Sequence, residues 1–198
     1  MKFSADSIRE KLGDLGEEPR HEIRAWGDIE LGELREAAVL IPLVEMPNGE
    51  FDVLLTKRSE ALRQHSGEVS FPGGRRDPED DTLVTTALRE AREEVGLFEA
   101  DVRVHGAFYS MPTISNYALT AYVGEVRGPY EFVPNPAEID VLIQAPLREL
   151  ADRAIYDVTQ REWNGHVFDM HSFLYDGHTI WGATGLMLDA FIRFLKLR

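Results

Sequence analysis

One segment, residues 83–97, constrains this chain more than any other. Its apolar side chains recur at the spacing of one helix face, at Val84, Ala87, Leu88, Ala91 and Val95. Successive helical residues turn by about 100°, so these five form a single stripe. The segment is therefore predicted to be an amphipathic helix that packs on a hydrophobic core.

The same helix carries three carboxylates beside its apolar stripe, Glu90, Glu93 and Glu94, next to Arg89. Like charges at this spacing destabilise a helix by about 0.2–0.5 kcal/mol per pair, and partial burial raises that cost. A bound cation removes the penalty. Because the only clustered donors are oxygens, the pattern favours Mg²⁺ or Mn²⁺ over zinc. The same residues also fit a solvated acidic face on which Arg89 and Glu93 form an ordinary i,i+4 ion pair.

Two glycines, Gly73 and Gly74, precede the helix at a predicted turn, and basic residues gather around them. These are Lys57, Arg58, Arg63, Arg75 and Arg76. The chain as a whole has a formal net charge of -14, which repels nucleic acids and anionic membranes from most of the surface. The basic residues therefore either bind a small polyanionic substrate or balance acidic neighbours on the surface.

The end of the helix resembles the signature of the Nudix hydrolases. Their motif is Gly, five residues, Glu, seven residues, then Arg-Glu-apolar-x-Glu-Glu-x-Gly-apolar. Residues 89–97 read REAREEVGL and match its tail at every fixed position. The front departs from the motif, because Gly74 is one residue farther from Arg89 and Asp80 or Asp81 replaces the first Glu.

The segment before the helix is similar to an extra motif of one Nudix branch, the coenzyme A pyrophosphatases. It covers residues 54–74 and reads LLTKRSEALRQHSGEVSFPGG. Members of this branch continue through GG-x-x-D-x-x-D into TALREA-x-EEVGL, which Asp77, Asp80 and residues 86–97 reproduce. The spacing between Gly74 and Arg89, one residue longer than in the general motif, is therefore expected in this branch. Residues 180–184, IWGAT, also resemble the start of the last helix in this branch.

The resemblance implies an α/β fold, a Nudix-type α/β/α sandwich with a mixed sheet between helices, and the order of predicted elements agrees. One domain is expected over 1–198, with a helix and arm at 1–35 and a core at 36–198. Asp80 or Asp81 is predicted to cap the acidic helix. Strands are predicted at 37–44, 51–56, 69–71, 102–109, 117–126 and 139–143, a hairpin at 155–175 that turns back at 176–177, and helices at 4–15, from 146 and at 182–195.

By resemblance, the acidic helix supplies a site for Mg²⁺ or Mn²⁺. Glu90 and Glu94 are the expected ligands, with Glu93 in support and a backbone carbonyl of Gly73 or Gly74 completing the shell. Metal ions serve pyrophosphate hydrolysis twice, because they neutralise phosphate oxygens and place a deprotonated water in line with one phosphorus.

Three residues are the expected catalytic groups. Arg89 is expected to orient a neighbouring Glu through a charge-assisted hydrogen bond, so its loss should damage geometry more than charge. Nudix hydrolases draw the general base from the box or from a distant loop. Glu93 lies in the box, and Glu138, in the segment 135–138 that reads NPAE, is the loop candidate.

The branch resemblance implies that the substrate is coenzyme A or a derivative, cut into adenosine 3',5'-bisphosphate and 4'-phosphopantetheine or its acyl form. Arg58 or Arg63 could bind the 3'-phosphate with two hydrogen bonds. His65 could contact substrate or bond only to its own backbone. Phe71, Phe108, Tyr109 or Tyr130 could stack on adenine, although each more often belongs to a core. The expected substrate-binding residues are Arg58, Arg63, His65, Gly67, Phe71, Gly73, Gly74 and Arg75.

Rival functions use the same residues. A Nudix hydrolase for ADP-ribose, NADH or dinucleoside polyphosphates has the same box but leaves the segment 54–74 unexplained. A nucleotide-sensing module that binds without hydrolysis has no reason to retain the unfavourable glutamate cluster. An isomerase of prenyl diphosphates usually relies on a Cys, which this chain lacks.

The absence of Cys fits a reducing compartment. The first residues, MKFSADSIREKLG, lack the apolar centre of a signal peptide, and no run of about 18 apolar residues is present. We therefore expect a cytoplasmic protein with a small-molecule substrate and no nucleic-acid or membrane partner, and family analogy allows a homodimer. His166 and His171 would face opposite sides of one strand and could not share a metal.

Overall fold

Two adjacent strands form the centre of the molecule. In the computed structural model, which describes residues 3–21, 33–62, 64–163 and 165–197, β2 (Arg35–Glu45) is buried over residues 37–44. It pairs in parallel with β7 (Tyr117–Arg127) along its whole length. The prediction of a buried strand from the continuous apolar run is thus confirmed.

The other strands extend this pair into a mixed sheet. Its order is β1-β6-β7-β2-β3-β4, with β5 paired to β2 and β8 paired to β3. The pairs β1/β6 and β2/β7 are parallel, and the other pairs are antiparallel. The bounds are β1 (Arg20–His21), β3 (Phe51–Arg58), β4 (Val69–Ser70), β5 (Gly73–Arg75), β6 (Val102–Pro112) and β8 (Ile139–Pro146).

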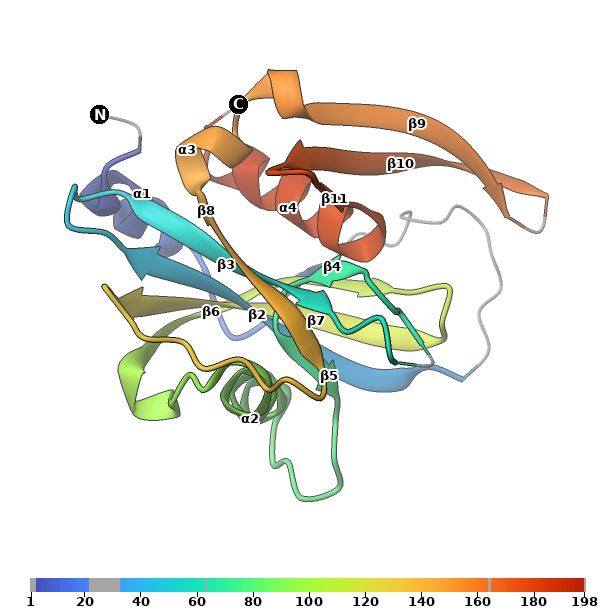
Figure 1. The fold of residues 1–198 in the computed structure, drawn as a ribbon, viewed down its shortest axis with the longest axis horizontal. Helices are drawn as coiled ribbons and strands as arrows, with labels where there is room; N and C mark the ends of the chain where they lie inside the picture. Colours follow the sequence, from blue (N-terminus) through green and yellow to red (C-terminus); the bar gives the residue numbers. More distant parts are fainter. Residues whose placement is uncertain (1–2, 22–32, 63, 164, 198) are drawn as a thin grey trace.

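A second, smaller sheet lies over the first, together with the last helix (Figure 1). Its strands run in the order β11-β10-β9, and both pairs are antiparallel. The helix α4 packs against β10. The bounds are β9 (Tyr156–Trp163), β10 (His166–Tyr175), β11 (His178–Ile180) and α4 (Gly182–Phe194).

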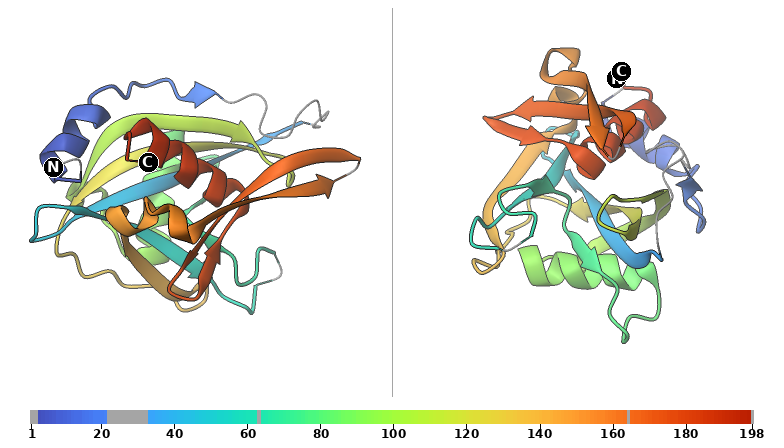
Figure 2. Two further views of the ribbon diagram at one scale, coloured as in Figure 1. Left: turned by 90° about the horizontal axis from the view of Figure 1, so that it is seen from above. Right: turned by 90° about the vertical axis from the view of Figure 1, so that its right-hand side faces the viewer.

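Helices cover both faces of the large sheet, which Figure 2 shows from two sides. On one face, Leu88 and Ala91 of α2 pack with Leu40 of β2. On the other face, Leu12 of α1 and Phe191 of α4 belong to a separate apolar cluster. The expected α/β/α sandwich is therefore the observed fold. The remaining bounds are α1 (Ala5–Leu12), α2 (Leu83–Val95), α3 (Leu147–Leu150) and the 3₁₀ turns η1 (Glu99–Asp101) and η2 (Arg153–Ile155).

Two predictions next to α2 are wrong. The glycine pair is the short strand β5 and not a turn, because Gly73 and Gly74 pair with Val39 and Ala38 of β2. Neither Asp80 nor Asp81 caps the helix. Thr82 is the N-cap and accepts a hydrogen bond from the backbone N–H of Thr85, whereas Asp80 is buried and bonded to Arg89.

The C-terminal hairpin also differs from its prediction. β9 and β10 are antiparallel and the chain reverses between Trp163 and His166, while the predicted turn at 176–177 joins β10 to β11. The exposed residues of β9 gave the sequence no apolar alternation from which to locate the reversal. Pro146 ends β8 and precedes α3 as its N-cap. Within the described residues, no helix is long and apolar enough to cross a membrane.

Candidate active site

The acidic helix is fixed at both ends by local hydrogen bonds. Thr82 caps the N-terminus, and Gly96 takes the left-handed conformation at the C-terminus with φ 68°. The backbone N–H of Leu97 then reaches back to the carbonyl of Ala91, which closes the last turn. These ends fix where α2 begins and ends, and the packing of Leu88, Ala91 and Val95 on the sheet leaves Glu94 buried beside them.

Glu94 is a buried carboxylate with two donors. The residue is 1% exposed. Its Oε1 accepts from Nη1 of Arg58 at 3.1 Å, and its Oε2 accepts from the backbone N–H of Gly73 at 3.1 Å. Burial nevertheless raises the pKa of Glu94 to about 7, and the charges of Glu90 and Glu138 add to the rise. The site therefore has a strong preference for additional positive charge.

Glycines in β5 make room for the carboxylates. A Cβ on Gly74 would lie 2.6 Å from the carboxylate carbon of Glu90. A Cβ on Gly73 would lie 2.4 Å from the carbonyl oxygen of Ala38 in the neighbouring strand. No other residue fits either position without displacement. The diglycine thus brings backbone into contact with Glu90 and Glu94.

Arg89 links four acidic or carbonyl groups around the helix. Its Nη1 donates to Glu90 at 2.9 Å and to Glu93 at 3.1 Å, and its Nη2 donates to the carbonyl of Arg75 at 3.0 Å. Its Nε and Nη2 also bind both oxygens of Asp80. Arg89 is therefore bonded to Glu90, and its expected role in orienting a neighbouring Glu for catalysis stays a prediction.

Asp80 is a buried acid whose side chain is held by hydrogen bonds. It accepts hydrogen bonds from Arg89, from the backbone N–H of Asp77 and from the hydroxyl of Thr86. The bonds from Arg89 outweigh the effect of burial and lower the pKa of Asp80 to about 2. Asp80 thus occupies the acidic position of the motif but binds Arg89 instead of facing Glu94.

Glu93 and Glu138, the other two catalytic candidates, have different surroundings. The Glu93 side chain is 54% exposed and is bonded to Arg89. Glu138 precedes β8 and accepts from the side-chain amide of Asn135 at 3.2 Å. The backbone of Asn135 in turn donates to the carbonyl of Glu94. This contact places the segment 135–138 alongside the end of α2. There the charge of Glu138 contributes to raising the pKa of both Glu90 and Glu94.

The acidic groups fit a divalent cation by their chemistry. Glu90, Glu94 and Glu138 provide hard oxygen donors, and burial raises the pKa of Glu90 as well as that of Glu94. As placed, with arginines bound to their oxygens, no three His, Asp or Glu side chains of the described residues form a cluster that could hold an ion. A cation bound at this site would therefore take over part of the neutralisation of the glutamate charges that Arg58 and Arg89 provide.

A pocket of about 390 Å³ adjoins the carboxylates. Of the predicted substrate-binding residues, Arg58, His65, Phe71, Gly73, Gly74 and Arg75 line it. Gly67 stands next to this group, where its N–H binds the carbonyl of Arg58. Arg63 lies outside the described residues. The ring of His65 bonds to Glu68 at 2.9 Å, so its contact is with a neighbouring side chain and not with its own backbone.

The aromatic residues proposed to stack on adenine lie mostly in the interior. Phe71, Phe108 and Tyr109 are at most 5% exposed, and the latter two contact each other in the core. Tyr130 packs on Phe132 beside the end of α2. Only Phe71 reaches the pocket wall. Burial therefore argues against stacking by Phe108 and Tyr109.

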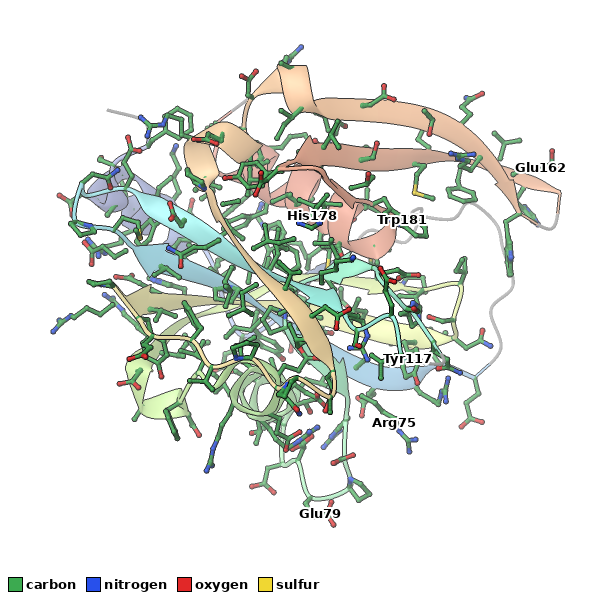
Figure 3. The ribbon with its side chains drawn as sticks, viewed as in Figure 1. Arg75, Glu79, Tyr117, Glu162, His178 and Trp181 are labelled. Atoms are coloured by element: carbon green, nitrogen blue, oxygen red, sulfur yellow. The ribbon has the colours of Figure 1, made fainter. Side chains whose placement is uncertain are left out.

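Among the pocket residues that the sequence reasoning missed, three have large side chains and lie on or next to the small sheet. Phe168 and Met170 on β10, and Trp181 before α4, line the pocket from the small sheet. Figure 3 labels Trp181 above, with Tyr117 and Arg75 of the large sheet below it. The spacing of Phe168 and Met170 places both on one strand face. That spacing could not indicate which face meets the large sheet.

Fold and site together define the class of protein, an α/β/α sandwich with buried carboxylates beside a pocket. A family model described as the NUDIX domain matches residues 34–164. The uncharacterized Nudix hydrolase NudL of Photorhabdus laumondii is 36% identical over 154 residues, which cover 78% of this chain and 81% of that protein. The NudL protein of Yersinia pestis is 38% identical, with 78% and 76% covered.

A solved structure agrees with this relationship. The Nudix hydrolase RenU of M. smegmatis superimposes with a TM-score of 0.52 at 26% identity, over 64% of this chain and 84% of RenU. The chain therefore belongs to the Nudix hydrolase family. It is a pyrophosphohydrolase that acts on nucleoside diphosphate derivatives.

Proposed function

We propose that the chain hydrolyses the diphosphate of coenzyme A or its derivatives, to give adenosine 3',5'-bisphosphate and 4'-phosphopantetheine or its acyl form. The contact between Arg58 and Glu94 carries this proposal. Arg58 belongs to the segment 54–74, which resembles the coenzyme A branch, and Glu94 belongs to the Nudix box. The segment that other Nudix substrates leave unexplained thus adjoins both the carboxylates and the pocket.

In this proposal, Glu90 and Glu94 hold Mg²⁺ or Mn²⁺, with Glu93 in support and a carbonyl of Gly73 or Gly74 as a further ligand. Such a cation, when bound, supplies neutralisation of phosphate charge and a more acidic water. Arg89 keeps the carboxylate of Glu90 oriented through its 2.9 Å bond. The protein thereby fixes its anionic groups before the substrate arrives.

The remaining groups bind the substrate or move a proton. Arg58 is paired with Glu94, so we assign it to the diphosphate and not to the more distant 3'-phosphate. Glu138 is the proposed acceptor of the proton of the attacking water. Glu93 is the alternative, although it is half exposed and bound to Arg89. Comparison of the pH–rate profiles of Glu138→Gln and Glu93→Gln identifies the base, because only its loss removes the acidic limb.

The runner-up function is hydrolysis of ADP-ribose or NADH, and a non-hydrolytic nucleotide sensor is the alternative from another class. Purified protein with millimolar Mg²⁺ is expected to release adenosine 3',5'-bisphosphate from coenzyme A much faster than AMP from ADP-ribose or NADH. The reverse ranking would overturn the substrate assignment and leave the family intact. Tight binding of these nucleotides with no product in any reaction would support the sensor.

The setting of the enzyme is also part of the proposal. We place it in the cytoplasm, because the absence of Cys fits a reducing compartment, and we propose that residues 1–198 form a single domain. Its net charge of -14 disfavours nucleic acids as partners. A homodimer rests on family analogy alone and can be tested by light scattering.

A further inference from the structure

The pocket beside the carboxylates has two chemically different walls. The wall formed by the large sheet and the loop after β3 carries the charged lining residues Arg58, Glu68 and Arg75, together with His65. The opposite wall comes from β10 and the start of α4 and contributes Phe168, Met170, Trp181, Gly182, Ala183 and Thr184. None of these six residues is charged.

The volume of the pocket limits what it can hold. About 390 Å³ lies near the lower end of the range for small-molecule sites. Coenzyme A has two halves joined at the diphosphate, and a pocket of this size accommodates one of them. The question is therefore which half lies between the two walls.

Charge favours the half with fewer phosphates. The nucleotide half carries a second phosphate, whereas 4'-phosphopantetheine carries one phosphate on a thin, neutral arm of amides and methylenes. The lining offers two arginines, but Arg58 is already paired with Glu94. It also contains Glu68, which repels a further dianion. The lining thus suits a single phosphate beside the carboxylates and a neutral chain.

The apolar wall supports the same choice. Trp181 and Ile114 both line the pocket and are each 43% exposed. Exposed apolar side chains that gather in one groove, unlike scattered single ones, mark a ligand-binding surface. In Figure 3 Trp181 stands over the labelled Tyr117, which also lines the pocket. A methylene and thioester chain leaving the diphosphate would pass between these aromatic residues.

We propose that this pocket is the subsite for the pantetheine arm, including any acyl group on its sulfur, and that the adenosine 3',5'-bisphosphate half lies outside it. The inference rests on the proposed hydrolysis of coenzyme A. It assigns specificity to Met170 and Trp181, which lie far from the Nudix box in the sequence. Both residues lie on the wall opposite the charged lining residues, so the role assigned to them is confined to binding.

The test compares binding of the two product halves by calorimetry, with wild-type protein and with Met170→Glu. The new carboxylate places charge in the path of the neutral arm, so binding of 4'-phosphopantetheine should weaken by about tenfold or more. Binding of adenosine 3',5'-bisphosphate should change by less than about twofold. The kcat/KM for coenzyme A should fall in parallel with the affinity for 4'-phosphopantetheine.

Two further variants guard against a folding artefact. Val167→Glu adds the same charge to the same strand, at a residue that is 61% exposed and does not line the pocket. It should leave both affinities and the kcat/KM unchanged. Trp181→Ala removes an exposed apolar side chain. It should weaken the binding of 4'-phosphopantetheine and have little effect on the thermal unfolding temperature.

The outcomes separate this inference from the proposed function. If wild-type protein does not cleave coenzyme A, the proposed function fails and the subsite fails with it. If coenzyme A is cleaved but Met170→Glu weakens the binding of adenosine 3',5'-bisphosphate instead, the pocket holds the nucleotide half. If cleavage is intact and neither affinity changes in Met170→Glu and Trp181→Ala, the pocket is not a substrate subsite.

Discussion

Nη1 of Arg58, the last residue of β3, lies 3.1 Å from Oε1 of Glu94 on α2. The two residues are 36 positions apart in the sequence. A register shift between Lys57 and Arg58, where β3 pairs with β8, coincides with this contact. The pair provides a buried carboxylate with a cationic partner and joins the two sequence motifs into one site.

Glu94→Gln tests the central carboxylate. We expect turnover to fall by orders of magnitude, because an amide is a poor substitute for an anionic ligand. The fold should be retained, since Gln keeps the size of the side chain and an acceptor for the N–H of Gly73. Steady-state kinetics and urea unfolding measure the two effects. Glu79→Gln, on the exposed loop before α2 (Figure 3), is the matched control. Full activity, or unfolding, of Glu94→Gln contradicts the assigned role.

Arg89→Lys tests the positioning of Glu90. Lysine cannot reproduce the simultaneous bonds to Asp80, Glu90 and Glu93, so kcat should fall by about 10–100-fold. The free energy of unfolding should also fall, by about 2 kcal/mol. Arg92→Lys changes an exposed residue of the same helix and should do neither. An unaltered kcat in Arg89→Lys would mean that Glu90 needs no such support.

Gly74→Ala tests the close approach of β5 to the helix. The added methyl would lie 2.6 Å from the Glu90 carboxylate, which must move away. We expect most activity to be lost while circular dichroism stays native. Gly16→Ala is a suitable control because a Cβ there meets nothing within 4 Å. Wild-type turnover by Gly74→Ala would show that the position of Glu90 is not critical.

Asp80→Asn tests acid stability. The pKa of Asp80 is lowered from 3.8 to about 2, so its ionised form stabilises the fold. That stabilisation is fully present above pH 3.8 and is lost as the pH falls toward 2. The difference in unfolding free energy between wild type and Asp80→Asn should therefore be constant from about pH 7 to 5 and shrink in more acidic buffer. Asp81→Asn, at an exposed residue, should match wild type throughout. A difference that does not depend on pH would exclude Asp80 as the source.

Local sequence patterns predicted those features that neighbouring residues decide. The helix with its apolar stripe, the buried strand at 37–44 and the acidic cluster all follow from spacings of two to four residues. The pairing of Gly73 with Val39 did not follow, because it depends on the return of a distant strand. The inward turn of Asp80 also escaped prediction. Asp is a common helix cap, and only the position of Arg89 makes burial of its carboxylate favourable.

By itself, the sequence determined the family, the amphipathic helix and the types of side chain that meet at the site, since these depend on residue identity and short spacing. Only the tertiary structure decided that Arg58 binds Glu94 and that β5 brings its backbone against Glu90. It also decided that Phe168, Met170 and Trp181 line the pocket. Strand order and sheet packing set these relationships, and they join residues that no local periodicity connects.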